Sequence, residues 1–510
     1  MKILKVIKNI IFSRLTLAIL SLAIQIFLIV FVISYFNRNL AWIFGFFGLL
    51  NTIVVLFIIN SKSNPSYKIA WIIPILLFPG VGVLVYLFFK LQISIRLMNK
   101  RLKSEIENSR KYLVQDDLIL SKIRREERGL YNLASYLNKT SNFPIYNINN
   151  IDYFESGLLQ FKDMIEQLKK AKKFIFIEYF IVERGYMFNS ILNILKEKAK
   201  EGVEVRIMYD GFGSLLLLDH DYPETLAEFG IKCKIFSPIK PIISAHQNYR
   251  DHRKICIIDG KIAYTGSMNI ADEYINLKKR FGYWKDTGVK LEGDVVNSFI
   301  VMFLELWNLE NKVEEYDKYI TKNELKQKDG YVIAYADNPF DEYELGKRVY
   351  LDIINNALEY VYIVTPYLIL DDEMLSALTY ASLRGVDVRI VMPSIPDKKL
   401  VNYLGKSYYE ELLEVGVKIY EYKYGFTHAK MFISDDIKAV VGSINLDYRS
   451  LYLHFESAVY LYKNKIIKDI KKDYQDMIKN SDRITSENMK NFSIIKKIIG
   501  RILRFLAPLM

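Results

Sequence analysis

Cysteine is scarce in this chain, and the shortage excludes several kinds of protein. Among 510 residues the cysteines are Cys233 and Cys256, and they do not form a Cys-x-x-Cys pair. Two cysteines cannot build a disulfide framework, so the fold does not depend on an oxidising compartment. We expect both thiols to be buried in strands.

Metal-binding patterns are also lacking. The chain has five histidines, and no grouping of His, Cys, Asp and Glu shows the spacing of a metal site. We therefore expect chemistry without a metal or other cofactor. Acidic residues are outnumbered, 58 against 70 basic ones, which gives a formal net charge of +12. That excess favours anionic partners, either acidic lipid surfaces or nucleic acid.

Three long stretches near the N-terminus have no charged residues. They are Leu15–Phe36, Leu40–Asn60 and Ile69–Phe89. About twenty apolar residues in a helix cross a hydrocarbon core of roughly 30 Å. The first stretch is too long for a secretory signal and has no small-residue cleavage site. Because three such stretches in succession are difficult to bury otherwise, we predict a membrane-anchoring region over residues 1–96.

The orientation of this region is less certain from sequence. Basic residues precede the first stretch and follow the third, and the positive-inside rule places both flanks in the cytoplasm. That arrangement needs an even number of crossings. The third stretch is interrupted by Pro74, Pro79, Gly80 and Gly82. Either one stretch is re-entrant or interfacial, or the N-terminus lies outside. We expect a multi-pass membrane protein whose domains after the third stretch are cytoplasmic.

The C-terminal segment, residues 486–510, predicts a basic amphipathic helix. Apolar residues recur at helical spacing from Ile494 to Leu506, with Lys496, Lys497, Arg501 and Arg504 between them. Such a helix can lie along an anionic bilayer surface. The alternative is a terminal helix packed on the body of the protein.

One motif occurs twice. His252 is followed by Lys254, Asp259 and Gly266-Ser267-Met268-Asn269, and His428 by Lys430, Asp435 and Gly442-Ser443-Ile444-Asn445 at the same offsets. The motifs lie in two similar units, each with a strand, a helix, a glycine and a second strand. The predicted elements are Phe174–Ile177, Ile191–Lys200 and Val203–Tyr209, then Val361–Val364, Met374–Leu383 and Val386–Met392. A repeat of about 180 residues indicates a duplicated α/β domain with helices on both faces of a sheet.

Two His and two Lys brought together can handle a phosphodiester without a metal. In a strand, residues two apart share a face, so His and Lys of one motif point the same way. One imidazole can attack phosphorus while the other transfers protons. The lysines and the amides of Asn269 and Asn445 would neutralise the phosphoryl oxygens. Each His also needs a partner for its second nitrogen, and the candidates are Glu456 for His428 and Asp286 for the first half. We predict that His220, His246 and His454, which do not share the spacing, are surface or structural residues.

The duplicated His-x-Lys-x4-Asp motif resembles the signature of the phospholipase D superfamily. Within it the chain is similar to bacterial cardiolipin synthases, on strings such as Ile177-Glu178-Tyr179-Phe180 and Asn445-Leu446-Asp447-Tyr448-Arg449. The resemblance implies a fold of two pseudo-symmetric phospholipase D-like sandwich domains after an N-terminal transmembrane region. It implies six catalytic residues: His252, Lys254, Asp259, His428, Lys430 and Asp435. Ser267, Asn269, Ser443, Asn445, Asp286 and Glu456 are expected to bind phosphate or support the site.

The reaction implied by the resemblance is a transphosphatidylation. One phosphatidylglycerol would give a phosphatidyl-histidine and glycerol, and a second would accept the phosphatidyl group to form cardiolipin. We take His252 as the nucleophile and His428 as the acid and base. The alternatives are a membrane-bound phospholipase D that uses water, a membrane-tethered nuclease, and a lipid-binding scaffold with a decayed site.

The predicted organisation has five parts. Between the membrane region and the repeat we expect a charged helical connector, residues 97–130. Two phospholipase D-like domains follow, residues 131–325 and 326–485, and then the tail helix.

Overall fold

The computed structural model describes residues 40–90, 93–239, 248–309, 316–322, 325–341 and 343–509. The predicted stretch Leu15–Phe36, the basic flank before it and His246 lie outside these residues. The chain divides into two compact units, Met1–Leu91 and Gln92–Met510, close to the predicted boundary at residue 96.

The N-terminal unit is made of apolar helices, α3 (Leu40–Ile59), α4 (Pro65–Leu77) and α5 (Val81–Lys90). The second predicted stretch is confirmed as one helix of 20 residues, which is about 30 Å long. The third is not one helix. It breaks between α4 and α5, where Gly80 has a φ of +80°. Proline lacks an N–H to donate, so Pro79 beside Gly80 ends the helical hydrogen bonding.

A buried polar side chain fastens this break. Asn51 of α3 donates to the Ile75 carbonyl at 3.2 Å and accepts from the Gly80 N–H at 3.3 Å. Gly82 allows α4 and α5 to approach, because a Cβ there would lie 2.6 Å from Ile75 Cα. At 13 and 10 residues, α4 and α5 are each shorter than a bilayer core requires. By itself α4 therefore suits a re-entrant or interfacial segment, one of the alternatives left open by the sequence.

The outer surface of this unit is apolar. Phe46, Leu49, Leu77 and Leu84 are each more than 60% exposed. By length and composition, the helical stretch Val81–Tyr112, which begins with α5 and continues beyond this unit, is long and apolar enough to cross a membrane. Exposed apolar side chains in this number are stable in lipid rather than in water.

The second unit is built on one 16-stranded sheet. Fifteen of its strands follow the order β18-β13-β12-β11-β15-β16-β17-β10-β1-β9-β7-β6-β2-β3-β4, and the sixteenth, β5, pairs with β17. The strands of the first half are β1 (Tyr146–Phe154), β2 (Phe174–Tyr179), β3 (Glu204–Asp210), β4 (Lys232–Phe236), β6 (Lys254–Ile258), β7 (Ile262–Gly266) and β9 (Gly288–Gly293). Those of the second half are β10 (Lys328–Asp337), β11 (Tyr360–Val364), β12 (Asp387–Pro393), β13 (Lys418–Tyr422), β15 (Met431–Ser434), β16 (Lys438–Gly442), β17 (His454–Tyr462) and β18 (Ser481–Ile484). The short strands are β5 (Arg250–Asp251), which pairs with β17, and β8 (Tyr283–Lys285), which pairs with β14 (Gly425–Thr427).

The two halves repeat one topology. β2, β3 and β4 are parallel and β6 is antiparallel to β2, just as β11, β12 and β13 are parallel and β15 is antiparallel to β11. The halves meet where β1 pairs antiparallel with β10. This confirms the predicted duplication and each of the six predicted elements in it.

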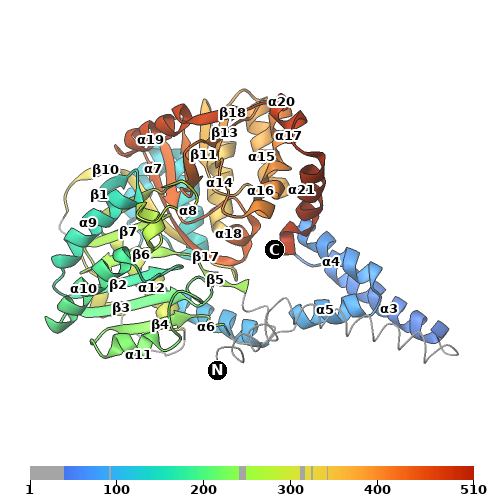
Figure 1. Cartoon of the computed structure of the whole chain (residues 1–510). Coiled ribbons are helices and arrows are strands. Elements are labelled where there is room, and N and C mark those ends of the chain that lie inside the picture. The colour runs from blue at the N-terminus through green and yellow to red at the C-terminus, as the bar shows by residue number, and fades with distance from the viewer. Residues whose placement is uncertain are drawn as a thin grey trace. The chain divides into compact units, whose positions relative to one another are not determined.

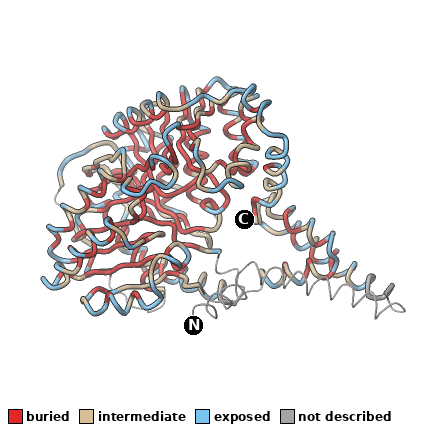
Figure 2. Tube along the Cα trace, viewed as in Figure 1, coloured by how far each residue is buried: buried red, intermediate tan, exposed pale blue. Residues whose placement is uncertain are grey.

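Helices cover both faces of the sheet (Figure 1). They are α9 (Gly157–Lys169), α10 (Tyr186–Lys200), α11 (Tyr222–Ala227), α12 (Val296–Trp307), α13 (Tyr316–Tyr319), α14 (Leu345–Asn355), α15 (Asp372–Leu383), α16 (Lys399–Lys406), α17 (Tyr409–Glu414), α18 (Tyr448–Tyr452) and α19 (Ile467–Lys479). Buried residues fill the layers between helices and sheet (Figure 2). Successive residues of β2 alternate between the two layers: Phe174 and Phe176 join one core, Ile175 and Ile177 the other. Cys256 is buried as predicted, whereas Cys233 is partly exposed.

The first of these cores crosses the predicted domain boundary. It contains Phe299 of α12 and Ile333 of β10 as well as Val361 of β11. The predicted connector also joins it: α6 (Ile93–Ser109), α7 (Asp117–Glu126) and α8 (Arg128–Ser141) contribute Leu102, Ile123 and others. The two phospholipase D-like halves and the connector are thus one compact unit.

The C-terminal tail forms two helices, α20 (Ser486–Lys490) and α21 (Ile494–Leu506). α21 packs against α16, where a Cβ on Gly500 would lie 2.3 Å from the Tyr403 carbonyl oxygen. Its basic residues face the body. Lys497 and Arg501 pair with Glu410 of α17 at 2.8 and 3.3 Å, and Arg504 pairs with Glu411 at 3.1 Å.

The apolar face of α21 consequently points away from the body. Ile494, Ile495, Ile498 and Ile502 are 67%, 67%, 51% and 58% exposed. The helix is packed on the body, one of the two predicted alternatives, but through its basic side rather than its apolar side.

Candidate active site

Each His-Lys motif is held in place by strands from the other half of the molecule. β5 leads into His252 and pairs with β17, and the His252 N–H donates to the Phe455 carbonyl at 2.9 Å. β14 leads into His428 and pairs with β8, and the His428 N–H donates to the Lys285 carbonyl at 2.8 Å. The two exchanges are reciprocal, so the repeats interlock at the two histidines.

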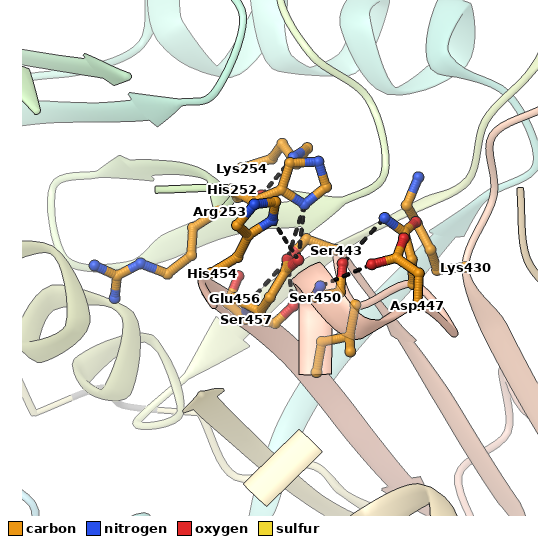
Figure 3. Close-up of polar contacts among 12 residues, drawn as sticks. His252, Arg253, Lys254, Lys430, Ser443, Asp447, Ser450, His454, Glu456 and Ser457 are labelled. Carbon is orange, nitrogen blue, oxygen red and sulfur yellow. Dashed lines mark hydrogen bonds and ion pairs between the residues drawn. The ribbon is translucent and has the colours of Figure 1, made fainter. Parts of the chain in front are cut away.

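The carboxylates also pair across the halves. The carboxylate oxygens of Glu456 lie 2.9 and 3.0 Å from His252 Nδ1 (Figure 3). Asp286 Oδ1 lies 2.8 Å from His428 Nδ1. We predicted the opposite assignment, Glu456 with His428 and Asp286 with the first half. The prediction was wrong because β17 and β8 each run beside the strand of the other motif. A carboxylate can only accept here, so each Nδ1 carries the proton and each Nε2 is left with its lone pair.

The serines of the Gly-Ser turns orient these carboxylates. Ser267 Oγ donates to Asp286 at 2.5 Å, and Ser443 Oγ donates to Glu456 at 2.5 Å. Each serine oxygen also accepts a backbone N–H, from Thr287 and from Ser457, at 3.0 Å. These serines therefore support the site from behind the His-carboxylate pairs.

Four buried basic groups surround the space between the motifs. Burial lowers the pKa of His428 to about 4, with Lys430 adding to the effect and Asp286 opposing it. Burial lowers the pKa of His252 well below its ordinary value, and Lys254 and Lys430 act in the same direction. The charge of Lys430 acts on His252 and that of Lys254 on His428, in agreement with the interlocked strands that bring the two motifs together. Both imidazoles are neutral near pH 7.

The two lysines are anchored to their own motifs. Lys254 Nζ donates to the His252 carbonyl, and Lys430 Nζ donates to the His428 carbonyl at 2.5 Å. Burial lowers the pKa of Lys254 to about 8 against the opposing charges of Glu456 and Asp251. Burial lowers that of Lys430 to about 7, opposed by Asp286. A bound anionic phosphate would raise both pKa values and hold the lysines in the charged form.

The two asparagines tie neighbouring loops together. Asn269 accepts from the Ile181 N–H at 3.1 Å and donates to Tyr274 Oη at 2.9 Å. Asn445 donates to Ser450 Oγ at 3.0 Å. Each amide therefore has one N–H engaged with protein, which leaves the second for the predicted phosphate contact.

The two motif aspartates lie elsewhere. Asp259 follows β6 at the end opposite Lys254 and accepts the N–H groups of Lys172, Lys173 and Phe174 at 2.8, 2.6 and 3.0 Å. Asp435 follows β15 and accepts those of Leu358, Glu359 and Tyr360, each at 2.9 Å. The expectation that both are active-site residues therefore needs correction. In each motif the Asp lies five residues after the Lys along an extended strand, so it lies at the opposite end of that strand from the Lys.

A buried ionic network beneath His252 was missed. Arg253 Nε pairs with Glu178 at 2.8 Å and with Asp251 at 3.5 Å. The Asp251 N–H donates to Asp210 at 3.0 Å, and Arg250 lies 3.6 Å from the same carboxylate. These residues fix the β5 turn that presents His252. The sequence could have indicated this network, because Glu178 is a charged residue within the otherwise apolar strand β2.

His454 was also missed. Its side chain is buried, and its ring centroid lies 5.5 Å from that of His252. We predicted a surface or structural residue because His454 lies outside the motif spacing. The signal available was its position two residues before Glu456, which places both on one face of β17. His220 is exposed, as predicted.

Comparisons with known proteins agree with this geometry. The family model described as "Cardiolipin synthase, PLD-like domain" matches residues 164–288 and 350–478, and "Phospholipase_D-nuclease N-terminal" matches residues 49–90. A solved phosphatidylserine synthase of Haemophilus influenzae shares the fold with a TM-score of 0.57 and 16% identity, covering 75% of this chain and 97% of that one.

Sequence relatives extend over almost the whole chain. The cardiolipin synthase of Alkalihalophilus pseudofirmus is 34% identical over 500 residues, 95% of this chain and 98% of that protein. The cardiolipin synthase of Halalkalibacterium halodurans is 34% identical over 492 residues, 93% of this chain and 96% of that protein. An uncharacterised Streptococcus mutans protein is 49% identical over 458 residues, 89% of this chain and 99% of that one.

A duplicated α/β fold that joins two His-x-Lys motifs in one site defines a phosphatidyltransferase of the phospholipase D superfamily. Within that class, the chain belongs to the cardiolipin synthase family. It is a membrane protein whose substrates are phospholipids.

Proposed function

We propose that this protein makes cardiolipin from two molecules of phosphatidylglycerol, without a metal, through a phosphatidyl-histidine. The observation that supports this most directly is the reciprocal pairing of His252 with Glu456 and of His428 with Asp286. Two neutral imidazoles, each with a free Nε2, then face one substrate phosphorus. Such a pair can divide nucleophilic and proton-transfer work.

In the first step, His252 Nε2 attacks phosphorus and the bond from phosphorus to the glycerol oxygen breaks. The bound phosphate anion raises the pKa of His428, so that with substrate present the ring carries a proton on Nε2 as well as on Nδ1. His428 gives this Nε2 proton to the glycerol oxygen, and glycerol leaves. We assign the acid role to His428 because Asp286 favours its protonated form against the effect of burial. Lys254 and Lys430 neutralise the phosphoryl oxygens while charge builds up.

In the second step, the terminal hydroxyl of another phosphatidylglycerol gives its proton to His428 and attacks phosphorus. The bond from phosphorus to His252 Nε2 breaks, and cardiolipin is released. Glu456 stabilises the positive charge that the His252 ring carries in the intermediate. Because water competes at this step, the apolar groups that face the histidines matter: Phe180 lies 5.0 Å from His252, and Trp284 lies 5.6 Å from His428, between ring centroids.

A product assay tests the proposal. Purified full-length protein with phosphatidylglycerol as the lone lipid should yield cardiolipin and glycerol in equal amounts. Phosphatidic acid without cardiolipin would identify a hydrolase, and shortened DNA with intact phosphatidylglycerol would identify a nuclease. His252→Ala and His428→Ala should abolish synthesis, whereas His220→Ala, at an exposed histidine, should not.

Mass analysis of trapped protein tests the order of the two histidines. We expect a phosphatidyl adduct on the peptide that carries His252. An adduct on the peptide that carries His428 would reverse the two roles and leave the overall reaction intact.

We further propose that α21 lies against the lipid headgroups with Ile494, Ile495, Ile498 and Ile502 in the apolar layer. The ion pairs to Glu410 and Glu411 fix the outward direction of these side chains. Lys496 is exposed beside them, as expected for contact with anionic lipid. A fluorophore on Ile498→Cys should be quenched by lipid-borne quenchers in vesicles. The matched control is Leu383→Cys, an exposed apolar position of α15, which should stay unquenched.

For the topology, we propose a multi-pass protein of the bacterial cell membrane whose catalytic unit is cytoplasmic. The basic residues after α5, among them Arg96, Lys100 and Arg101, support this under the positive-inside rule. Two free cysteines suit a reducing compartment. A protease added outside intact cells should leave the catalytic unit uncut, and cleavage there would contradict the proposed orientation.

A further inference from the structure

A third imidazole lies beside the His252–Glu456 pair, and the proposed reaction does not use it. His454 begins β17, two residues before Glu456, so both side chains leave the strand on the same face. Its Nδ1 is 3.8 Å from Glu456 Oε1, beyond hydrogen-bond distance. Figure 3 shows the His252 and His454 rings on neighbouring sides of the Glu456 carboxylate.

His454 is an unsatisfied polar group in a buried place. Its side chain is 9% exposed, and neither ring nitrogen has a hydrogen-bond partner among the described residues. A buried polar group without a partner costs about 1–3 kcal/mol. A ligand that both His454 and Glu456 could bind would remove this cost.

The three side chains supply the donors of a metal site. One donor atom each of His252, His454 and Glu456 lies within 4.8 Å of the other two. Tetrahedral Zn²⁺ with bonds of about 2.0–2.1 Å needs donors about 3.4 Å apart. The His252–Glu456 and His454–Glu456 separations of 2.9 and 3.8 Å bracket that value. Two imidazoles and one carboxylate form a common zinc ligand set, with a fourth position left open.

We propose that His252, His454 and Glu456 form a binding site for a divalent transition-metal ion of the zinc type, and that the ion inhibits the enzyme. Binding replaces the proton on His252 Nδ1, which leaves to solvent, and occupies the carboxylate that holds this proton. With Nδ1 bound to a cation, the ring donates less electron density through Nε2. The nucleophile and the metal therefore compete for one imidazole.

The donor atoms set the selectivity of the site for a metal ion, and the surrounding charges set its affinity. Mg²⁺ prefers oxygen donors and near-octahedral geometry, so a site with two imidazoles discriminates against it. The positive charges of Lys254 and Lys430 also act on His252. Their charge weakens the hold on a dication, so we expect binding in the micromolar range rather than tighter.

Zinc binding to the metal-free full-length protein in detergent tests the site without any turnover. Titration calorimetry with Zn²⁺ should show one ion bound to the wild type. His454→Asn removes a direct ligand, and the affinity should fall by more than about 100-fold. His220→Asn, at an exposed histidine, is the matched control and should bind as the wild type does. An unchanged affinity in His454→Asn, or no zinc bound to the wild type, would overturn the proposal.

Inhibition is measured separately, with each variant compared with its own zinc-free rate. Cardiolipin formation by the wild type should fall at micromolar Zn²⁺, recover with EDTA and stay constant with Mg²⁺ at the same concentration. His454→Asn and His454→Gln should both need at least about tenfold more Zn²⁺. Wild-type sensitivity in both variants would refute the site. The inhibition assay rests on the proposed function, but the calorimetric binding assay does not. If the proposed function is wrong, zinc binding is still measurable, and if the zinc site is wrong, cardiolipin synthesis is still measurable.

Discussion

At the scale of single residues, the site depends on which carboxylate holds which imidazole. Glu456 and His252 come from different halves, as do Asp286 and His428. Each carboxylate fixes the proton on Nδ1 and so directs Nε2 toward the substrate. Loss of one carboxylate therefore affects the motif histidine of the other half. Removing Glu456 affects His252, and removing Asp286 affects His428.

Burial of the histidines makes stability depend on pH. Burial lowers the pKa of His428 to about 4, helped by Lys430 and Lys254 and opposed by Asp286, from an ordinary value of 6.5. Below pH 6.5 the unfolded chain takes up a proton that the folded protein does not bind. Stability from this group is full above pH 6.5 and is lost as pH falls toward about 4, up to about 3 kcal/mol.

Thermal unfolding of detergent-solubilised protein at several pH values would measure this. The Tm of His428→Asn should fall less steeply than that of the wild type between pH 6.5 and 4. His220→Asn should follow the wild type, because that side chain is exposed. Parallel curves for the wild type and His428→Asn would show that His428 titrates normally in the folded protein.

Sequence spacing was sufficient to predict that His252 lies beside Lys254, and His428 beside Lys430, because each motif is local to one strand and its face follows from the two-residue period. It was insufficient for residues whose role depends on pairing between halves. His454, Glu456 and Asp286 lie beside histidines that are distant in sequence or in the other half. The pairing of β5 with β17 and of β8 with β14 decides their partners, and short strands of this kind have no periodic pattern to read.

At the scale of elements, the motif aspartates fasten strand ends. Asp259 and Asp435 have φ values of +56° and +54°, in the left-handed region that Asp tolerates. Each accepts three backbone N–H groups at the start of the neighbouring strand, β2 or β11. The repeat of this contact in both halves explains why Asp recurs at the same offset without reaching the substrate.

We predict that Asp259→Ala reduces stability more than chemistry. Three backbone donors would lose their acceptor, at a cost of about 1–3 kcal/mol. The Tm should fall, while the rate per folded molecule should drop far less than in Lys254→Met, for which we expect a loss of at least about 100-fold. Asp259→Asn keeps one carbonyl oxygen and tolerates the backbone angle, so its Tm should lie between those of Ala and wild type. A rate loss in Asp259→Asn as large as in Lys254→Met would show that Asp259 takes part in catalysis.

Membrane contact is also decided by elements. The sequence indicated an amphipathic tail helix, but its periodicity could not show which side faces the protein. The structure shows that Glu410 and Glu411 form ion pairs with the basic side of α21. Gly500 has no side chain, so the backbone of α16 can pack against it. The exposed isoleucines of α21 follow from these contacts. Similarly, Pro79 and Gly80 indicated an interruption of the stretch Ile69–Phe89, whereas the hydrogen bond from the Gly80 N–H to Asn51, which fastens the break, could not be read from the sequence.

At the scale of the whole molecule, the repeat does not produce two independent domains. One core extends from α12 through β10 to β11, and the sheet is continuous across β1 and β10. Neither half alone contains a complete His-carboxylate pair. The duplication therefore supplies two histidines to one site rather than two sites.

This arrangement predicts the outcome of mixing inactive variants. His252→Ala and His428→Ala each remove one imidazole from a site that is completed within a single chain. Mixed in equal amounts in phosphatidylglycerol vesicles, the two should remain inactive in cardiolipin synthesis. Wild-type protein diluted with either variant should lose activity only in proportion to the dilution. Restored synthesis in the mixture would mean that halves of different chains combine, which requires β5 and β14 to exchange their partners β17 and β8 between molecules.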